Sequence, residues 1–177
     1  IEMIIGSAFA DTLGGSTGND ALSGGGGDDV LNGGAGADAY DGGAGVDTVT
    51  YALSASGVTV NLATNSATGG DAAGDTFVSV ERLIGSDFAD SFTGSAADEI
   101  FEGGAGNDTL SGAGGSDTLD GGSGDDTIIG GAGADIIIGG TGFDTADYSS
   151  SAIAVQITLD GSAASGGDAA GDTLSGI

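Results

Sequence analysis

Large apolar side chains recur every nine residues in two blocks of the chain. They are Leu13, Leu22, Leu31, Tyr40 and Val49, and then Phe92, Phe101, Leu110, Leu119, Ile128, Ile137 and the smaller Ala146. Small or polar residues flank most of them, as in Thr109-Leu110-Ser111, which is the alternation of a strand with one inward-facing side chain. The pattern therefore predicts one short β-strand in every nine residues.

An acidic residue stands two positions before each of these apolar residues. We call the members of this series the ladder acids: Asp11, Asp20, Asp29, Asp38 and Asp47, and then Asp90, Glu99, Asp108, Asp117, Asp126, Asp135 and Asp144. Glycines precede most of them by five, four and two positions, as in GGAGAD at 130–135. Glycine adopts positive φ at little cost, so the first six residues of each repeat are predicted to form a tight loop.

The nine-residue unit resembles the RTX repeat, G-G-x-G-x-D-x-U-x, of Gram-negative secreted proteins. The segments GGAGNDTLS (103–111) and GGSGDDTII (121–129) match it at every defined position. The resemblance implies an all-β fold, a parallel β-roll or β-solenoid of glycine-rich nonapeptide repeats with two repeats per coil. It also implies Ca²⁺ ions between stacked loops that are 18 residues apart.

Stacking at this interval would place ladder acids above one another at about one strand spacing, roughly 4.8 Å. Like charges at that distance are unfavourable unless a cation lies between them, and Ca²⁺ takes six to eight oxygen ligands. We expect roughly six to eight calcium ions in the chain. The predicted ligands are the carboxylates of Asp11, Asp20, Asp29, Asp38, Asp47, Asp90, Asp108, Asp117, Asp126, Asp135 and Asp144, with the loop carbonyls of Gly25, Gly27, Gly34, Gly36, Gly43, Gly45, Gly104, Gly106, Gly115, Gly122, Gly124, Gly131, Gly133, Gly140 and Gly142.

Several other acids are weaker candidates. The loop before Glu99 reads GSAAD, without the usual glycines, and those before Asp11 and Asp90 read GSAFA and GSDFA. Glu2 and Glu81 keep the nine-residue phase but lack glycine loops, so no ordinary site is predicted there. Two GGDAAGD segments, 69–75 and 166–172, hold acids that could form extra calcium sites or could simply be loop residues: Asp71, Asp75, Asp168 and Asp172.

A longer repeat lies above the nonapeptide, since residues 47–75 align without a gap to residues 144–172. This predicts unit 1 at 1–79 (roll repeats 2–50, connecting strands 51–79) and unit 2 at 80–177 (roll repeats 81–147, connecting strands 148–177). We expect one continuous solenoid of roughly ten coils, a fragment of a longer array. Segments 58–62 and 155–159 alternate as half-buried strands, and Tyr51 and Tyr148 are predicted to pack at the end of each roll.

Composition narrows the possible functions. The chain has 27 acidic residues against a single base, Arg82, for a net charge of −26, and no His or Cys. Nucleic acid is therefore not an expected partner, and no apolar run approaches the roughly 20 residues of a membrane span. Without His, Cys or Lys most nucleophile and general-base arrangements are missing. A two-carboxylate glycosidase stays formally possible, but the acids are already assigned to the ladder, so we expect no enzyme.

The resemblance implies two alternative functions. The first is a calcium-binding structural or adhesive module of a protein that folds on Ca²⁺ after type I secretion, in a surface layer, extracellular fibre or adhesin. The second is the C-terminal roll that assists secretion and folding of a protease, lipase or polysaccharide epimerase. Either implies a secreted or cell-surface location in a Gram-negative bacterium. The expected partners are calcium ions, further copies end to end, and a cell surface or polysaccharide.

Overall fold

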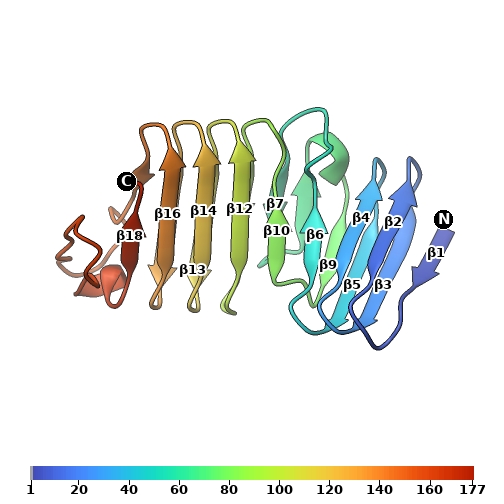
Figure 1. Ribbon diagram of the computed structural model, residues 1–177, viewed down its shortest axis with the longest axis horizontal. Coiled ribbons are helices and arrows are strands. Elements are labelled where there is room, and N and C mark those ends of the chain that lie inside the picture. The colour runs from blue at the N-terminus through green and yellow to red at the C-terminus, as the bar shows by residue number, and fades with distance from the viewer. Residues whose placement is uncertain (1) are drawn as a thin grey trace.

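The computed structural model describes residues 2–177 and is an all-β parallel solenoid. Its strands lie side by side along the long axis, with the two ends of the chain at opposite ends of the molecule (Figure 1). Its helical residues form two single turns of 3₁₀-helix, η1 (Gly70–Ala72) and η2 (Gly167–Ala169). The predicted fold class is confirmed.

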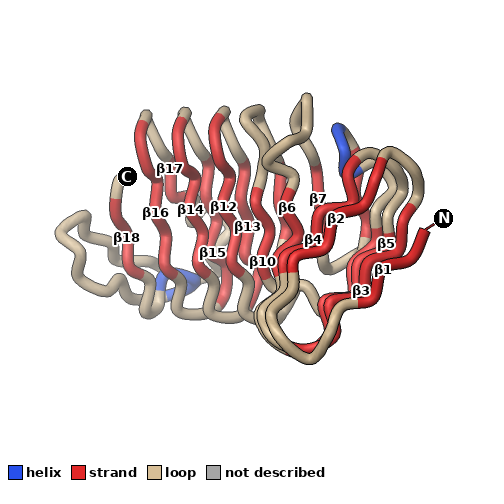
Figure 2. Tube along the Cα trace, turned by 45° about the vertical axis from the view of Figure 1, so that its right-hand side comes forward, coloured by secondary structure: helices blue, strands red, loops and turns tan. Residues whose placement is uncertain are grey.

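The strands form three sheets, and Figure 2 shows successive strands side by side along the molecule. Sheet A has four strands: β1 (Glu2–Ile5), β3 (Asp20–Gly26), β5 (Ala39–Ala44) and β9 (Thr76–Val78). Sheet B has eight: β2 (Thr12–Ser16), β4 (Val30–Gly34), β6 (Thr48–Thr50), β10 (Arg82–Ile84), β12 (Ile100–Ala105), β14 (Thr118–Ser123), β16 (Ile136–Thr141) and β18 (Thr173–Ser175). Sheet C has six: β8 (Ser66–Thr68), β7 (Thr59–Asn61), β11 (Ser91–Thr93), β13 (Thr109–Gly114), β15 (Thr127–Ala132) and β17 (Thr145–Ala146).

Within the two repeat blocks, neighbouring strands of a sheet are parallel and 18 residues apart. Leu110 of β13 lies beside Ile128 of β15, and Leu119 of β14 lies beside Ile137 of β16. Two nonapeptides therefore make one coil, as predicted. The strands are longer than the three residues that the alternation indicated, because pairing continues into the glycines, as between Gly104 and Gly122.

The apolar series forms one continuous core between the sheets. Its members are fully buried from the second repeat onward, and only the first and last, Leu13 and Ala146, retain some exposure. The core positions predicted from the sequence are confirmed. Each coil contributes one or two large side chains, so the stability of a coil depends on the coils stacked against it.

The loops require left-handed backbone at a fixed place, four residues before the ladder acid. Gly122 has a φ of 94° there, and in the repeat where Ala113 replaces glycine the alanine still has a φ of 74°. A non-glycine residue in this region costs roughly 1–2 kcal/mol. The stacking of the coils therefore imposes the loop conformation even on a residue that disfavours it.

The connecting segment of unit 1 changes which sheets face one another. After β6 in sheet B, the chain forms the antiparallel pair β7 and β8 at the start of sheet C. It then passes through η1, adds β9 as the last strand of sheet A, and returns to sheet B as β10. Sheet B thus continues past the point where sheet A ends. Each connecting segment occupies a single long coil, so sheet B has eight strands and the expectation of about ten coils is wrong.

The two connecting segments differ in their strands. Residues 59–61 form β7 as expected, but residues 155–159 form no strand and keep one isolated bridge, Gln156 to Ser165. The prediction of a strand there is wrong. β7 is supported on its other side by β11, whereas no strand among residues 2–177 lies in the corresponding place beside residues 155–159. The division into units 1–79 and 80–177 remains a prediction.

Candidate metal sites

The ladder acids stack on one another by a repeated hydrogen bond. The backbone N–H of each acid donates to the Oδ1 of the acid one coil further on, at 2.8 Å from Asp90 to Asp108 and at 2.8 Å from Asp108 to Asp126. The same bond joins Asp11 to Asp29, Asp20 to Asp38, Asp29 to Asp47, Glu99 to Asp117, Asp117 to Asp135, and Asp126 to Asp144. The structure therefore brings together every pair predicted from the sequence, including the doubtful one at Glu99.

The second carboxylate oxygen of most ladder acids is buried and has no hydrogen-bond donor from the protein. This holds for Oε2 of Glu99 and for Oδ2 of Asp29, Asp38, Asp47, Asp108, Asp117, Asp126, Asp135 and Asp144. A buried polar atom without a partner costs about 1–3 kcal/mol, and more when it is charged. These nine oxygens are therefore acceptors that a cation bound between the loops would satisfy.

The glycine loops direct further oxygens into the same gaps. An ideal Cβ built on Gly121 would lie 2.3 Å from Asp126 Oδ2 and 2.7 Å from the carbonyl oxygen of Gly139 in the next coil. The carbonyl of Gly106 points forward across the gap, 1.8 Å from the Cβ position of Gly124. Only glycine leaves this space open, and the nearest polar atoms to both Cβ positions are oxygens. Such a donor set suits a hard cation of the Ca²⁺ type.

Side chains alone do not complete a site. Among residues 2–177, no group of three or more acidic side chains is placed to hold a metal ion. The remaining ligands would have to be backbone carbonyls, as predicted at the glycines four and two positions before each acid. The structure adds the carbonyl five positions before the acid, such as that of Gly139, which sequence reasoning missed. Its recurrence at the first position of every loop was the available signal.

A family model of the RTX calcium-binding nonapeptide repeat matches four copies in residues 14–49, 79–110 and 111–146, which is more than half of the chain. The chain belongs to this RTX family. Its repeats are calcium-binding units on a β-roll, and the oxygen-lined gaps fit that ion. A search of the curated proteins finds no significant match. No helix within residues 2–177 is long and apolar enough to cross a membrane.

Three RTX ladder acids differ from the rest because a serine satisfies their second oxygen. Asp20 Oδ2 accepts the backbone N–H of Ser16 at 2.7 Å, and Asp90 Oδ2 accepts that of Ser86 at 2.6 Å. The backbone N–H of Ser7 donates to Asp11 Oδ2 in the same way. All three have serine in place of glycine four residues before the acid, and Ser95 has the same place before Glu99, where it donates to Oε1 and leaves Oε2 without a donor. These three acids open the two repeat blocks, where the protein supplies the donor that elsewhere is missing.

The GGDAAGD segments extend the RTX ladder into the connecting regions. Asp38 donates its N–H to Asp75 Oδ1 at 2.7 Å, and Asp135 donates to Asp172 Oδ1 at 2.9 Å. The hydroxyl of Tyr51 then donates to Asp75 Oδ2 at 2.8 Å, and that of Tyr148 donates to Asp172 Oδ2 at 2.7 Å. The tyrosines thus satisfy the second oxygen of the last acid in one of the two stacks of each unit. Asp71 and Asp168 lie on η1 and η2, where their N–H groups bond to serine hydroxyls, and their role as ligands remains a prediction.

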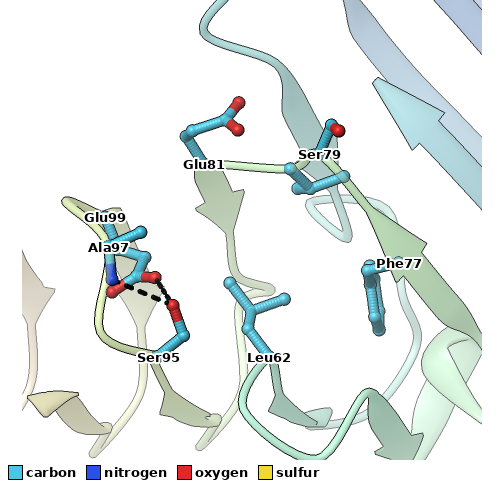
Figure 3. Close-up of a pocket in the computed structure, with 8 residues that line it drawn as sticks. Leu62, Phe77, Ser79, Glu81, Ser95, Ala97 and Glu99 are labelled. Atoms are coloured by element: carbon cyan, nitrogen blue, oxygen red, sulfur yellow. Dashed lines mark hydrogen bonds between the residues drawn. The ribbon is translucent and has the colours of Figure 1, made fainter. Parts of the chain in front are cut away.

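A cavity of about 220 Å³ marks an interruption of the ladder between the two units (Figure 3). Its lining includes Leu62, Phe77, Glu81 and Glu99. Glu81 Oε2 accepts the N–H of Asp47 at 3.0 Å, and Glu99 Oε1 accepts the hydroxyl of Ser95 at 2.5 Å. The longer stem of Glu81 therefore continues the stack from Asp47, whereas the side chain of Glu99 bonds to Ser95, so no hydrogen bond of the ladder joins Glu81 to Glu99. The lack of an ordinary site at Glu81 remains a prediction.

A second ladder of hydrogen bonds runs one residue before the RTX acids. Oδ1 of Asp28 accepts the N–H of Val46 at 2.9 Å, and Oδ1 of Asn107 accepts the N–H of Asp125 at 3.0 Å. Asn19, Asp98 and Asp125 make the same bond to the next coil. These side chains fix the spacing of the loops through a neutral acceptor or a carboxylate alike, which explains why both Asn and Asp occur there.

Burial and neighbouring carboxylates oppose ionisation of the RTX ladder. Burial, with the charges of adjacent ladder acids, raises the pKa of Asp108 to about 7 and that of Asp117 to about 7. Burial likewise raises the pKa of Asp126 and Asp135 above the ordinary value. A carboxyl whose pKa is higher in the folded than in the unfolded state stabilises the fold at low pH, and this stabilisation is lost as the pH rises through the folded-state pKa.

We therefore expect the stability of the RTX roll to change with pH in opposite directions with and without calcium. In chelator, the amount of β-structure should rise as the pH is lowered from 8 to about 5, because protons neutralise the ladder below the raised pKa of about 7. In excess calcium the denaturant midpoint should fall over the same range, because the ion holds the carboxylates ionised and protons compete with it. Circular dichroism spectra in chelator and denaturant titrations in calcium measure the two trends, and trends in the same direction would contradict a metal in the gaps.

Proposed function

We propose that this chain is a calcium-gated structural or adhesive module of a secreted protein, part of a surface layer, extracellular fibre or adhesin. The observation that carries the proposal is the row of nine buried carboxylate oxygens without protein donors. In a protein with 27 acidic residues and a single base, no side chain can neutralise them. The neutralising charge must therefore come from solution, and its concentration decides whether the coils can stack.

The physics of the ladder suits export by a type I secretion system. At low calcium concentration the stacked acids repel one another, and a chain of net charge −26 stays expanded and can be threaded through a channel. At the millimolar calcium concentrations outside cells, binding and folding occur together, because the sites do not exist in the unfolded chain. Calcium then acts as the signal that the chain has left the cell.

A calcium titration tests this function directly. Circular dichroism should show a cooperative gain of β-structure as calcium is added, and calorimetry should give roughly six to eight ions per chain. Magnesium at the same concentration should fold the chain far less well, since it demands octahedral geometry and keeps its water. Full β-structure in excess chelator, or a stoichiometry of one or two ions, would refute the proposal.

The surroundings of the segment in its parent protein separate the structural role from the alternative role in a secreted enzyme. More copies of the unit repeated at 47–75 and 144–172 would support a fibre, surface layer or adhesin. A catalytic domain in the same polypeptide would support a folding-assisting roll instead. The lack of His, Cys and Lys in this segment favours a role without catalysis of its own.

A further inference from the structure

Asp47 lies where the roll of unit 1 meets the turn between β9 and β10, and its backbone is bonded to that turn. Its N–H donates to Glu81 Oε2 at 3.0 Å, and its carbonyl oxygen accepts the N–H groups of Glu81 at 3.2 Å and of Arg82 at 3.0 Å. The side chain of Asp47 is fully buried, and within the described part of the chain its Oδ2 has no hydrogen-bond donor. One carboxylate oxygen at the boundary of the units therefore needs a partner that the protein does not supply.

The carbonyl oxygen of Ser79 points into the same space. An ideal Cβ on Gly42 would lie 2.0 Å from this carbonyl oxygen and 2.6 Å from Asp47 Oδ2, so the two oxygens border one gap. In the gaps between two glycine loops, the corresponding carbonyl oxygen comes from the first glycine of the second loop. Here it comes from the turn 79–81, which joins β9 to β10 and contains no glycine. The gap is therefore built differently from the sites of the nonapeptide repeat.

The turn that supplies this oxygen has a strained backbone. Ser79 has a φ of 48°, and among residues 2–177 only two other residues besides glycine have positive φ. A residue with a side chain is disfavoured in this conformation, so the surrounding structure must hold it there. Strain of this kind gathers at sites where a backbone group has to point in a set direction.

Unit 2 repeats the same construction at the equivalent place. Gly176 follows Asp172 by four residues, as Ser79 follows Asp75, and its φ of 67° is also left-handed. An ideal Cβ on Gly139 would lie 2.2 Å from the Gly176 carbonyl oxygen and 2.7 Å from Asp144 Oδ2. The Asp144 oxygen is likewise buried without a donor from the protein. The pairing of a block's last acid with a left-handed turn is thus a property of the unit.

We propose that a calcium ion binds between Asp47 and the turn 79–81 and fastens the two units together. Asp47 Oδ2, the Ser79 carbonyl oxygen and the Glu81 carboxylate are its protein ligands, and all are the oxygens that Ca²⁺ prefers. The ion lies where sheet A ends at β9 and sheet B continues into β10. This site rests on the proposed function, because it fills only when calcium folds the roll around it.

The cavity beside the turn gives water access to the boundary ion. Ser79 and Glu81 line it on one side, and Ser95 and Glu99 line it on the other (Figure 3). No glycine loop covers the turn on this side, so water completes the six to eight ligands of Ca²⁺. The boundary ion therefore binds more weakly than an ion between two glycine loops. It is the last to bind as the calcium concentration rises.

Two variants of Ser79 test the site on the full chain. Proline holds φ at about −65°, so Ser79→Pro turns the carbonyl oxygen away from Asp47, while Val78 before it is already extended in β9. Equilibrium dialysis at saturating calcium should find about one ion fewer per chain than in the wild type. Ser79→Gly is the matched control, because it keeps the carbonyl and favours left-handed backbone. It should bind as many ions as the wild type.

Glu81→Gln tests the carboxylate ligand without disturbing the turn. Glutamine keeps an acceptor for the N–H of Asp47 but removes the charge. Calorimetry should show the dissociation constant of the most weakly bound ion raised about tenfold. Asp41→Asn removes the same charge from an exposed position on β5 and should change that constant by less than about twofold.

Circular dichroism on each variant separates the two proposals. A wild-type chain that gains no β-structure with calcium refutes the proposed function. A Ser79→Pro chain that folds with calcium and binds as many ions as the wild type overturns the boundary site alone. If the proline variant does not fold, Glu81→Gln decides, and a weakest dissociation constant equal to that of Asp41→Asn overturns the boundary site.

Discussion

Gly124→Ala is expected to lower the free energy of unfolding in saturating calcium by about 3 kcal/mol or more. Gly124 has a φ of 130°, which disfavours any side chain. An added Cβ would lie 1.8 Å from the carbonyl oxygen of Gly106 in the preceding coil. That oxygen belongs to the backbone and faces the gap between loops, so it can move only if the coils separate. The cost therefore combines backbone strain with the loss of a predicted metal ligand.

Gly14→Ala is the matched control for this experiment. Gly14 lies in β2, and no atom comes within 4 Å of its Cβ position. Its substitution should leave the free energy of unfolding within about 0.5 kcal/mol of wild type. Denaturant unfolding followed by circular dichroism measures both variants. Similar values for the two would show that the coils do not approach one another as closely as the loop geometry requires.

Asp126→Asn is expected to raise the calcium concentration at the folding midpoint about tenfold without destabilising the metal-free chain. Asp126 is 1% exposed, and its Oδ1 accepts the N–H of Asp108 at 2.8 Å. Asparagine keeps an acceptor for that bond but removes the charge that attracts the ion. Burial and neighbouring carboxylates raise the pKa of Asp126, and a neutral asparagine avoids both the cost of burying a charge and the repulsion, so the metal-free coils should stack more readily.

Asp87→Asn makes the same change of charge at a position outside the ladder. Asp87 is exposed in the loop that precedes Asp90, so its loss should change the calcium midpoint by less than about twofold. Calcium titrations of both variants, in the same buffer, provide the comparison. Equal shifts would mean that net charge alone controls folding, and that the buried oxygen of Asp126 has no ion beside it.

The repeating part of the fold was predictable from the sequence because each level of the pattern agrees with the others. The nine-residue interval fixes which side chains enter the core, and the glycines fix where the chain turns. The pattern alone therefore places Leu110 and Ile128 in the core and pairs Asp108 with Asp126, and both predictions are confirmed. In a solenoid, contacts are between neighbours in a short repeat, so local pattern and long-range contact carry the same information.

The connecting segments were less predictable because their partners depend on topology. The alternation at 155–159 is as clear as that at 58–62, but only the latter has β11 beside it. The tyrosine hydroxyls were likewise assigned only to packing, since nothing local shows that Tyr51 reaches the carboxylate of Asp75, 24 residues away. The sequence analysis also did not anticipate that Ser16 donates a hydrogen bond to the second carboxylate oxygen of Asp20.

One sheet of the solenoid ends at each connecting segment, and it is a different sheet in each unit. β9 closes sheet A, while β18, its equivalent in the second unit, belongs to sheet B. Where sheet A stops, sheet B runs on from β6 to β10 without a break. In a row of such units, successive sheet ends would lie on alternating faces of the solenoid. A force that pulls the solenoid along its axis would then be opposed, wherever one sheet ends, by the unbroken strand pairing of the sheet on the opposite face.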